Sequence, residues 1–139
     1  MDALSWVVEG ELEGKASGSL TALLPITFDP REFVSSSVAV SGWNPQSRIV
    51  IVAIAGLNVM TIRFPSGLVS EVVRVYEISG DQNDASRATV LFIASDVSYN
   101  AYYGSIEVNF SSAERRINGK FFFVTNDGEK YDGEFNVTA

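Results

Sequence analysis

The stretch Ile117–Ala139, INGKFFFVTNDGEKYDGEFNVTA, contains Gly-x-Phe twice, once on each side of an Asn-Asp-Gly turn signal. Apolar and polar residues alternate on both sides of that signal, which is the period of half-buried β-strands. Cross-strand partners share one face of a sheet, and a three-residue loop, Asn126–Gly128, keeps odd-numbered residues opposite odd-numbered residues. The stretch therefore predicts a β-hairpin with Gly128 in the left-handed conformation.

This register places each phenylalanine of the repeat across from a glycine of the other strand. The predicted pairs are Phe121–Gly133, Gly119–Phe135 and Phe123–Tyr131. A ring that covers a glycine fills the space left by the missing side chain and fixes the register. We therefore interpret the repeated motif as core architecture and not as a ligand site.

The same alternation continues along the rest of the chain and predicts about ten short strands at a spacing typical of sandwiches and barrels. One strand is expected over residues 6–13, and Ile49–Ala55, apolar on both faces, predicts a central strand. Asp29–Phe33 is expected to form a single helical turn, and Asp96–Asn100 a connection. The fold class is predicted as all-β, a single antiparallel β-sandwich over residues 1–139, with a calycin-like closed β-barrel as the alternative.

The composition excludes several functions. A formal charge of −7 disfavours nucleic acid as a partner, because phosphate binding needs clustered lysine and arginine. The chain has no histidine and no cysteine, which removes the commonest general base, thiolate nucleophiles and the commonest metal ligands. We expect a protein that is not an enzyme and that has no cofactor.

Neither a membrane span nor an export signal is expected. The longest apolar run, Ile49–Leu57, is far shorter than the roughly 20 residues that cross a bilayer. The first residues lack the basic and long apolar regions of a signal peptide. A periplasmic or extracellular location is favoured if an export signal has been removed, and a cytoplasmic one otherwise.

Aromatic residues near turns are the candidate binding residues. Tyr99, Tyr102 and Tyr103 gather near one connection, and Trp43 lies in another turn. Tyrosine and tryptophan on loops combine a large contact area with a polar tip, so they suit a sugar or a protein partner. The alternative is that these rings pack inward or cover a sheet edge.

The loop Ser79–Ser86 concentrates oxygen ligands of the kind that calcium prefers, with Asp81, Asn83 and Asp84 as the candidates. It lacks the ligand spacing and the distal glutamate of an EF-hand. We therefore interpret it as an ordinary polar hairpin loop and expect no metal.

The C-terminal quarter resembles the end of a group of small uncharacterised bacterial domains that are often found on predicted exported lipoproteins. The resemblance rests on a Gly-x-Ile-x-Val strand followed by the two Gly-x-Phe strands. The matched positions are Gly104, Ile106, Val108, Ile117, Gly119, Phe121, Phe123, Gly133, Phe135 and Val137. It implies a β-sandwich and an envelope location, and it implies no activity. The chain departs from the group in lacking the lipoprotein cysteine.

Together these features predict a non-catalytic binding domain of a bacterial envelope or secreted protein, which contacts a protein or a glycan through loops at one end. Two alternatives remain open. One is a carrier that holds a small apolar ligand in a barrel cavity, and the other is an intracellular interaction module that neutralises a toxin, which suits the acidic charge.

Overall fold

The computed structural model describes residues 12–43, 46–81 and 83–139, and this part of the chain is all β-structure. The strands are β1 (Leu12–Leu23), β2 (Glu32–Val34), β3 (Ser37–Ser41), β4 (Val50–Ala55), β5 (Asn58–Arg63), β6 (Val73–Ser79), β7 (Thr89–Ala94), β8 (Val97–Asn100), β9 (Tyr103–Ser111), β10 (Arg116–Val124) and β11 (Lys130–Thr138). The predicted all-β fold of about ten antiparallel strands is confirmed.

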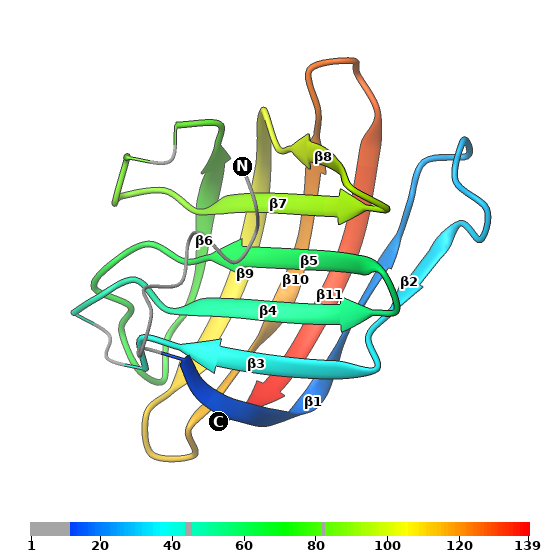
Figure 1. Ribbon diagram of the computed structural model, residues 1–139. Coiled ribbons are helices and arrows are strands. Elements are labelled where there is room, and N and C mark those ends of the chain that lie inside the picture. Colours follow the sequence, from blue (N-terminus) through cyan, green and yellow to red (C-terminus); the bar gives the residue numbers. More distant parts are fainter. Residues whose placement is uncertain (1–11, 44–45, 82) are drawn as a thin grey trace.

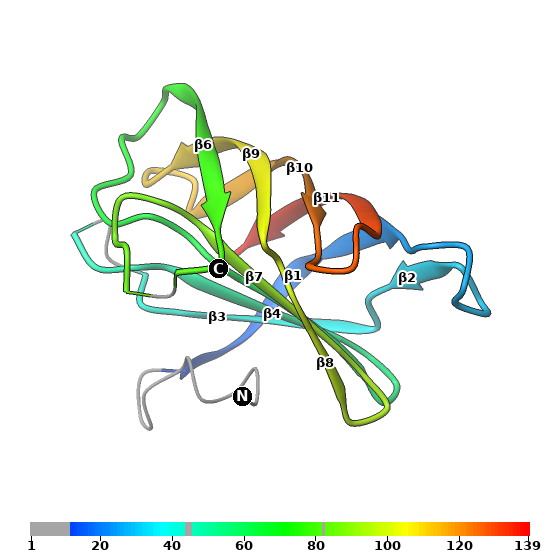
Figure 2. The same cartoon turned by 90° about the horizontal axis from the view of Figure 1, so that it is seen from above.

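The strands form one path that folds over into two layers (Figures 1 and 2). The path runs β6-β9-β10-β11-β1-β3-β4-β5-β7-β8, and β2 pairs with β1. We call β3, β4, β5, β7 and β8 the front sheet, and β6, β9, β10, β11 and the second half of β1 the back sheet. The strands of the two sheets cross steeply in Figure 1.

Strand β1 belongs to both layers because it changes partner midway. Ala16 pairs with Val38 of β3, whereas Ser17 pairs with Thr138 of β11. Gly18 lies at this change with a φ of 115°, and a side chain there would collide with the backbone carbonyl of Asn136. Glycine is required at this position because both the backbone conformation and the close approach exclude a Cβ.

The core lies between the two sheets and is filled by aromatic rings. Phe64 of the region after β5 packs on Phe135 of β11, with centroids 5.6 Å apart. Phe92 of β7 packs on Tyr131 of β11 at 5.8 Å. These contacts join front sheet to back sheet, so burial of apolar area holds the layers together.

The β10–β11 hairpin has the predicted register. Phe121 pairs with Gly133, Gly119 with Phe135 and Phe123 with Tyr131. Thr125 N donates to Glu129 O, which leaves Asn126–Gly128 as the loop, and Gly128 has a φ of 85°. The predicted central strand is also confirmed, because neighbouring residues Val50 and Ile51 of β4 are both buried.

Two local predictions were wrong. Glu32–Val34 is strand β2, paired with β1, and no helical turn forms over Asp29–Phe33. The segment expected as a connection contains β8, which pairs with β7 through a two-residue turn. Both turn residues, Ser95 and Asp96, have positive φ, which is the geometry of the tightest hairpins although glycine is absent. Of the strand expected over residues 6–13, residues 6–11 lie outside the described residues, and the remainder belongs to β1.

The ends of the strand path do not pair with each other as they do in a closed barrel. β6 and β8 are the two ends, and the only ladder contact that the described residues make across the β6–β7 gap is a parallel bridge between Ile78 and Ala88. The fold is therefore a curled, half-open sandwich joined along β1. Within the described residues no helix is long and apolar enough to cross a membrane.

Candidate functional site

Three connections meet at the upper end of the molecule in Figure 1 and form a groove of about 620 Å³. We call it the end groove; its lining residues are Ser79, Gly80, Asp81, Asn100, Ala101, Tyr102, Tyr103 and Asn126. They come from the end of β6, the β8–β9 connection and the β10–β11 loop. Backbone hydrogen bonds fix the middle segment, because Ala101 N donates to Val90 O at 3.0 Å and Tyr102 N to Val124 O at 2.8 Å.

Two exposed tyrosines dominate the end groove. Tyr102 and Tyr103 are 61% and 53% exposed, and their rings meet edge to face with centroids 6.1 Å apart. Tyr103 opens β9 and is held in register between Ser79 of β6 and Val124 of β10. A firmly paired backbone therefore presents two rings to solvent, where a ligand can reach both.

Polar side chains complete the end groove. Asn100 and Asn126 are exposed, and each amide can donate and accept hydrogen bonds. Asp81 is exposed too, and its Oδ1 accepts a hydrogen bond from Asn83 N at 3.0 Å, which leaves acceptor capacity for a ligand hydroxyl. The arrangement can bind a molecule that offers both hydroxyl groups and C–H surface.

The structure separates the other two predicted aromatic residues from this pair. Trp43 is half-buried, with its ring 5.3 Å from Phe110 and the guanidinium of Arg115 5.5 Å from the ring centroid. Phe110 and Tyr103 are seven residues, or about 24 Å, apart along β9, so Trp43 contacts the end of this strand away from the tyrosine pair. Tyr99 is a residue of β8, half-buried. Its ring packs on Phe28 and Phe92 at centroid distances of 5.4 and 6.0 Å.

The candidate calcium ligands make hydrogen bonds within their own loop. Asp84 Oδ1 accepts from Ser86 N at 3.0 Å and from Ser86 Oγ at 2.5 Å, and Asp84 Oδ2 lies 3.5 Å from Arg87 Nε. The hydrogen bonds from Ser86 lower the pKa of Asp84. Within the described residues, no group of three His, Cys, Asp or Glu side chains could hold a metal ion.

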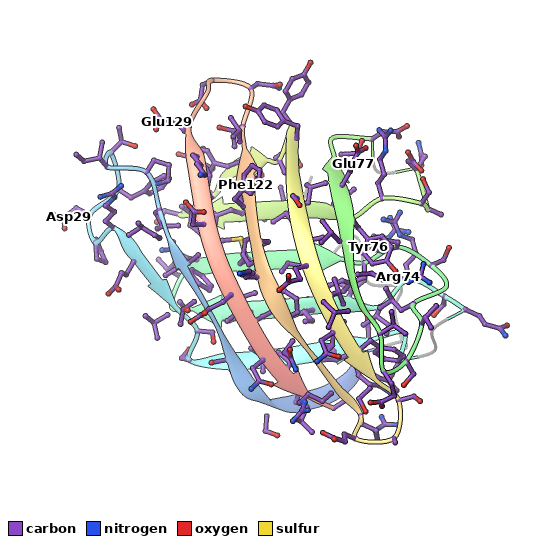
Figure 3. The ribbon with its side chains drawn as sticks, turned by 180° about the vertical axis from the view of Figure 1, so that it is seen from behind. Asp29, Arg74, Tyr76, Glu77, Phe122 and Glu129 are labelled. Atoms are coloured by element: carbon purple, nitrogen blue, oxygen red, sulfur yellow. The ribbon has the colours of Figure 1, made fainter. Side chains whose placement is uncertain are left out.

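A second hollow, of about 660 Å³, crosses the outer face of the back sheet, and we call it the outer trough. It is lined mainly by outward-facing residues of β1, β2, β6, β9, β10 and β11, and the buried rings of Phe33 and Phe121 lie at its floor. Lys120 stands between Glu107 and Glu134 of the neighbouring strands. Phe122 lies on the same face (Figure 3), with Lys130 Nζ 5.0 Å from its ring centroid. The further carboxylates that line it are Glu32 and Asp132.

Sequence reasoning missed the outer trough because outward positions of alternating strands are ordinarily solvated. The available signal was Phe122, an aromatic residue at an outward position between two inward phenylalanines.

No family model, no curated protein and no solved structure matches the chain.

Proposed function

We propose that the protein is a non-catalytic binding domain that holds a neutral glycan in the end groove. The observation that carries the proposal is the exposed pair Tyr102–Tyr103 beside a polar groove of about 620 Å³. A tyrosine ring offers an apolar face for the C–H side of a sugar and a hydroxyl for its polar edge. The volume lies within the range of small-ligand pockets, roughly 300–1,000 Å³.

Charge and hydrogen-bonding chemistry select the class of glycan. Asn100 and Asn126 can each bridge vicinal hydroxyl groups because an amide carries both a donor and an acceptor. Asp81 and the net charge of −7 disfavour anionic sugars. Because the chain has neither histidine nor cysteine, we assign it a binding role without a bond-breaking step. The envelope or secreted location implied by the C-terminal resemblance suits this role.

Binding of neutral gluco-, manno- and galacto-oligosaccharides tests the proposal. Saturation-transfer NMR and calorimetry on the full chain should detect one of these classes, and Tyr102→Ala or Tyr103→Ala should weaken it about ten-fold or more. Tyr102→Phe keeps the ring and should retain most of the affinity. Leu57→Ala, at an exposed turn elsewhere, is the matched control. Absence of binding to every class, or unchanged binding by both alanine variants, would contradict the proposal.

The outer trough supports a second candidate function, binding of a basic protein surface by an intracellular interaction module. Four carboxylates and one lysine line it, together with Phe122 and other apolar groups. A partner rich in lysine and arginine should bind with an affinity that falls as salt rises. Glu134→Lys should abolish such binding, whereas Glu114→Lys in the β9–β10 turn should not. The carrier alternative gains no support from the end groove or the outer trough, because both open at the surface.

A further inference from the structure

Strand β6 presents an open edge to solvent along its first part. It is seven residues long and ends the strand path, whereas β8 at the other end has four residues and the side strand β2 has three. Among the described strands, β6 forms a ladder only with β9. Natural sheets usually keep an exposed edge short, covered, or interrupted by proline, because an open edge pairs with other chains.

The backbone groups on this edge can be identified from the hydrogen bonds at its end. Ser79 N donates to Ala88 O, and Ala88 N donates to Glu77 O, so odd-numbered residues of β6 point their backbone groups away from β9. Antiparallel pairing alternates along a strand. The N–H and C=O groups of Val73 and Val75 therefore lie on the open edge, and within the described chain no backbone group pairs with them.

The side chains of β6 are unusual for an edge that stays in water. Val73 and Val75 are 58% and 67% exposed on the outer face. Arg74 and Tyr76 lie on the other face, at the margin of the back sheet in Figure 3; Tyr76 packs partly against the core, while Arg74 is exposed. No proline, glycine or lysine interrupts the strand to discourage pairing.

We propose that two copies of the chain associate by antiparallel pairing of β6 with β6 about a two-fold axis at Val75. Val75 then faces Val75 of the second copy and exchanges two backbone hydrogen bonds with it. Val73 faces Glu77, and Arg74 faces Tyr76, on each side of the axis. Arg74 and Tyr76 form close non-hydrogen-bonded pairs, in which the guanidinium can lie over the ring.

Neighbouring registers are less favourable for reasons visible in the strand. A shift of the axis to Arg74 places two arginines directly opposite each other, which is repulsive. A shift of the axis to Tyr76 requires the N–H of Ser79, which already donates to Ala88 O. The register at Val75 uses the N–H groups of Val73, Val75 and Glu77, none of which donates to another backbone group within the described chain, and it keeps like charges apart. Glu77 O, which already accepts from Ala88 N, is its one shared acceptor, and a carbonyl oxygen has two lone pairs, so β6 can pair with itself in this register. This inference is independent of glycan binding.

Charge sets the conditions under which the dimer forms. Each copy carries −7, so the two copies repel each other at long range. Screening reduces that repulsion, and the dimer should tighten as ionic strength rises from about 0.01 M to about 0.15 M. A dimer held by ion pairs between the copies would weaken instead.

Sedimentation equilibrium of the full chain over a concentration series, combined with amide hydrogen exchange, tests the proposal. We expect a monomer–dimer equilibrium, with the amides of Val73, Val75 and Glu77 gaining protection as concentration rises. Val75→Pro removes an outward N–H while every β6–β9 hydrogen bond is kept, and it should weaken the dimer at least ten-fold. Val34→Pro, at an outward position of the short edge strand β2, likewise keeps the β1–β2 hydrogen bonds and should not weaken the dimer.

Three outcomes would overturn the proposal. One is a monomer at every concentration and salt level. Another is a dimer of unchanged affinity in Val75→Pro with a native near-ultraviolet spectrum. The third is protection of the three amides that does not depend on concentration, which would show that the edge is covered within one molecule. Because hydrogen exchange uses the unmodified chain, the test holds even if a variant fails to fold.

Discussion

Phe121 lies directly opposite Gly133, and the tip of its ring occupies the space in which Gly133 would carry a side chain. A Cβ built on Gly133 would lie 2.7 Å from Cε1 of Phe121 and 2.8 Å from the carbonyl oxygen of Thr21. The ring of Phe121 and the backbone of β1 therefore both lie too close to Gly133 to leave room for a side chain there. The two Gly-x-Phe units of the sequence are two halves of one packing arrangement.

Gly133→Val should destabilise the protein, because the new side chain must displace a buried ring and a neighbouring backbone. Overpacking of this kind costs about 1–3 kcal/mol. The melting temperature of a chain of this size should fall by about 3–4 °C per kcal/mol, which calorimetry can measure. Glu134→Val introduces the same side chain at the adjacent exposed position and should change stability by less than about 0.5 kcal/mol. Equal melting temperatures for the two variants would contradict this packing of Phe121 on Gly133.

The hairpin could be predicted from sequence because its determinants are local. Loop parity, a glycine at the left-handed position and alternating rings leave a single register for Ile117–Ala139. The β7–β8 hairpin could not be predicted in the same way. Its turn residues, Ser95 and Asp96, adopt positive φ without the Asn-Gly or Asp-Gly pair that signals such a turn.

Two of the four candidate aromatic residues lie together in the end groove, and the reason lies in distance along the chain. Tyr102 and Tyr103 are adjacent, so one backbone conformation exposes both. Trp43 reaches its contacts with Phe110 and Arg115 only through the folding of one sheet over the other. The outer trough depends in the same way on six strands brought together from distant segments, which no local pattern encodes.

Stability should fall at alkaline pH because of Tyr131. Burial raises the pKa of Tyr131 above its ordinary value of 10.0, with the neighbouring Tyr99 and acidic groups acting in the same direction. Above pH 10 the unfolded chain loses this proton while the folded chain keeps it, so the stability present below that pH is lost as pH rises further. Within this window the single group contributes a slope of about 1.4 kcal/mol per pH unit.

Urea unfolding of the native protein and of Tyr131→Phe between about pH 8 and 11.5 measures this contribution. The variant removes the titrating group and should show a shallower alkaline loss of stability. Tyr102→Phe removes an exposed hydroxyl instead and should leave the slope close to that of the native protein. Identical slopes for Tyr131→Phe and the native protein would show that the ring ionises with equal ease in both states.

Arg48 joins three segments of the front sheet and should not tolerate lysine. Its Nε donates to Phe64 O at 2.9 Å and its Nη2 to Arg87 O at 2.6 Å. Burial, then the nearby Arg63, lowers the pKa of Arg48 to about 10, so the group stays charged at neutral pH. An ammonium cannot reproduce the fixed fork of a guanidinium. We expect Arg48→Lys to lose about 1–3 kcal/mol in chemical denaturation.

Arg31→Lys is the matched control for this variant. Arg31 is exposed, and its Nε donates to Leu24 O at 2.9 Å. This bond joins two residues only seven apart in the sequence, whereas the bonds of Arg48 reach 16 and 39 residues along the chain and hold separate segments together. The loss in Arg31→Lys should therefore be clearly smaller. A loss as large as that of Arg48→Lys would show that bridging between segments adds nothing.

Acid titration should reveal the hydrogen bond that closes the β10–β11 loop. The hydroxyl of Thr125 donates to Asp127 Oδ1 and lowers the pKa of Asp127 below its ordinary value of 3.8, with a smaller contribution from Glu129 N. A depressed pKa in the folded state gives stability that is present above pH 3.8 and is lost as pH falls through the folded value. Carbon-detected NMR of the carboxyl group from about pH 2 to 6 should show Thr125→Val returning the pKa of Asp127 toward 3.8.

Ser86→Ala, which removes the equivalent donor from Asp84, should move the pKa of Asp84 and leave that of Asp127 unchanged. If both variants moved Asp127 alike, a general loosening of the fold, and not the Thr125 hydroxyl, would be the cause.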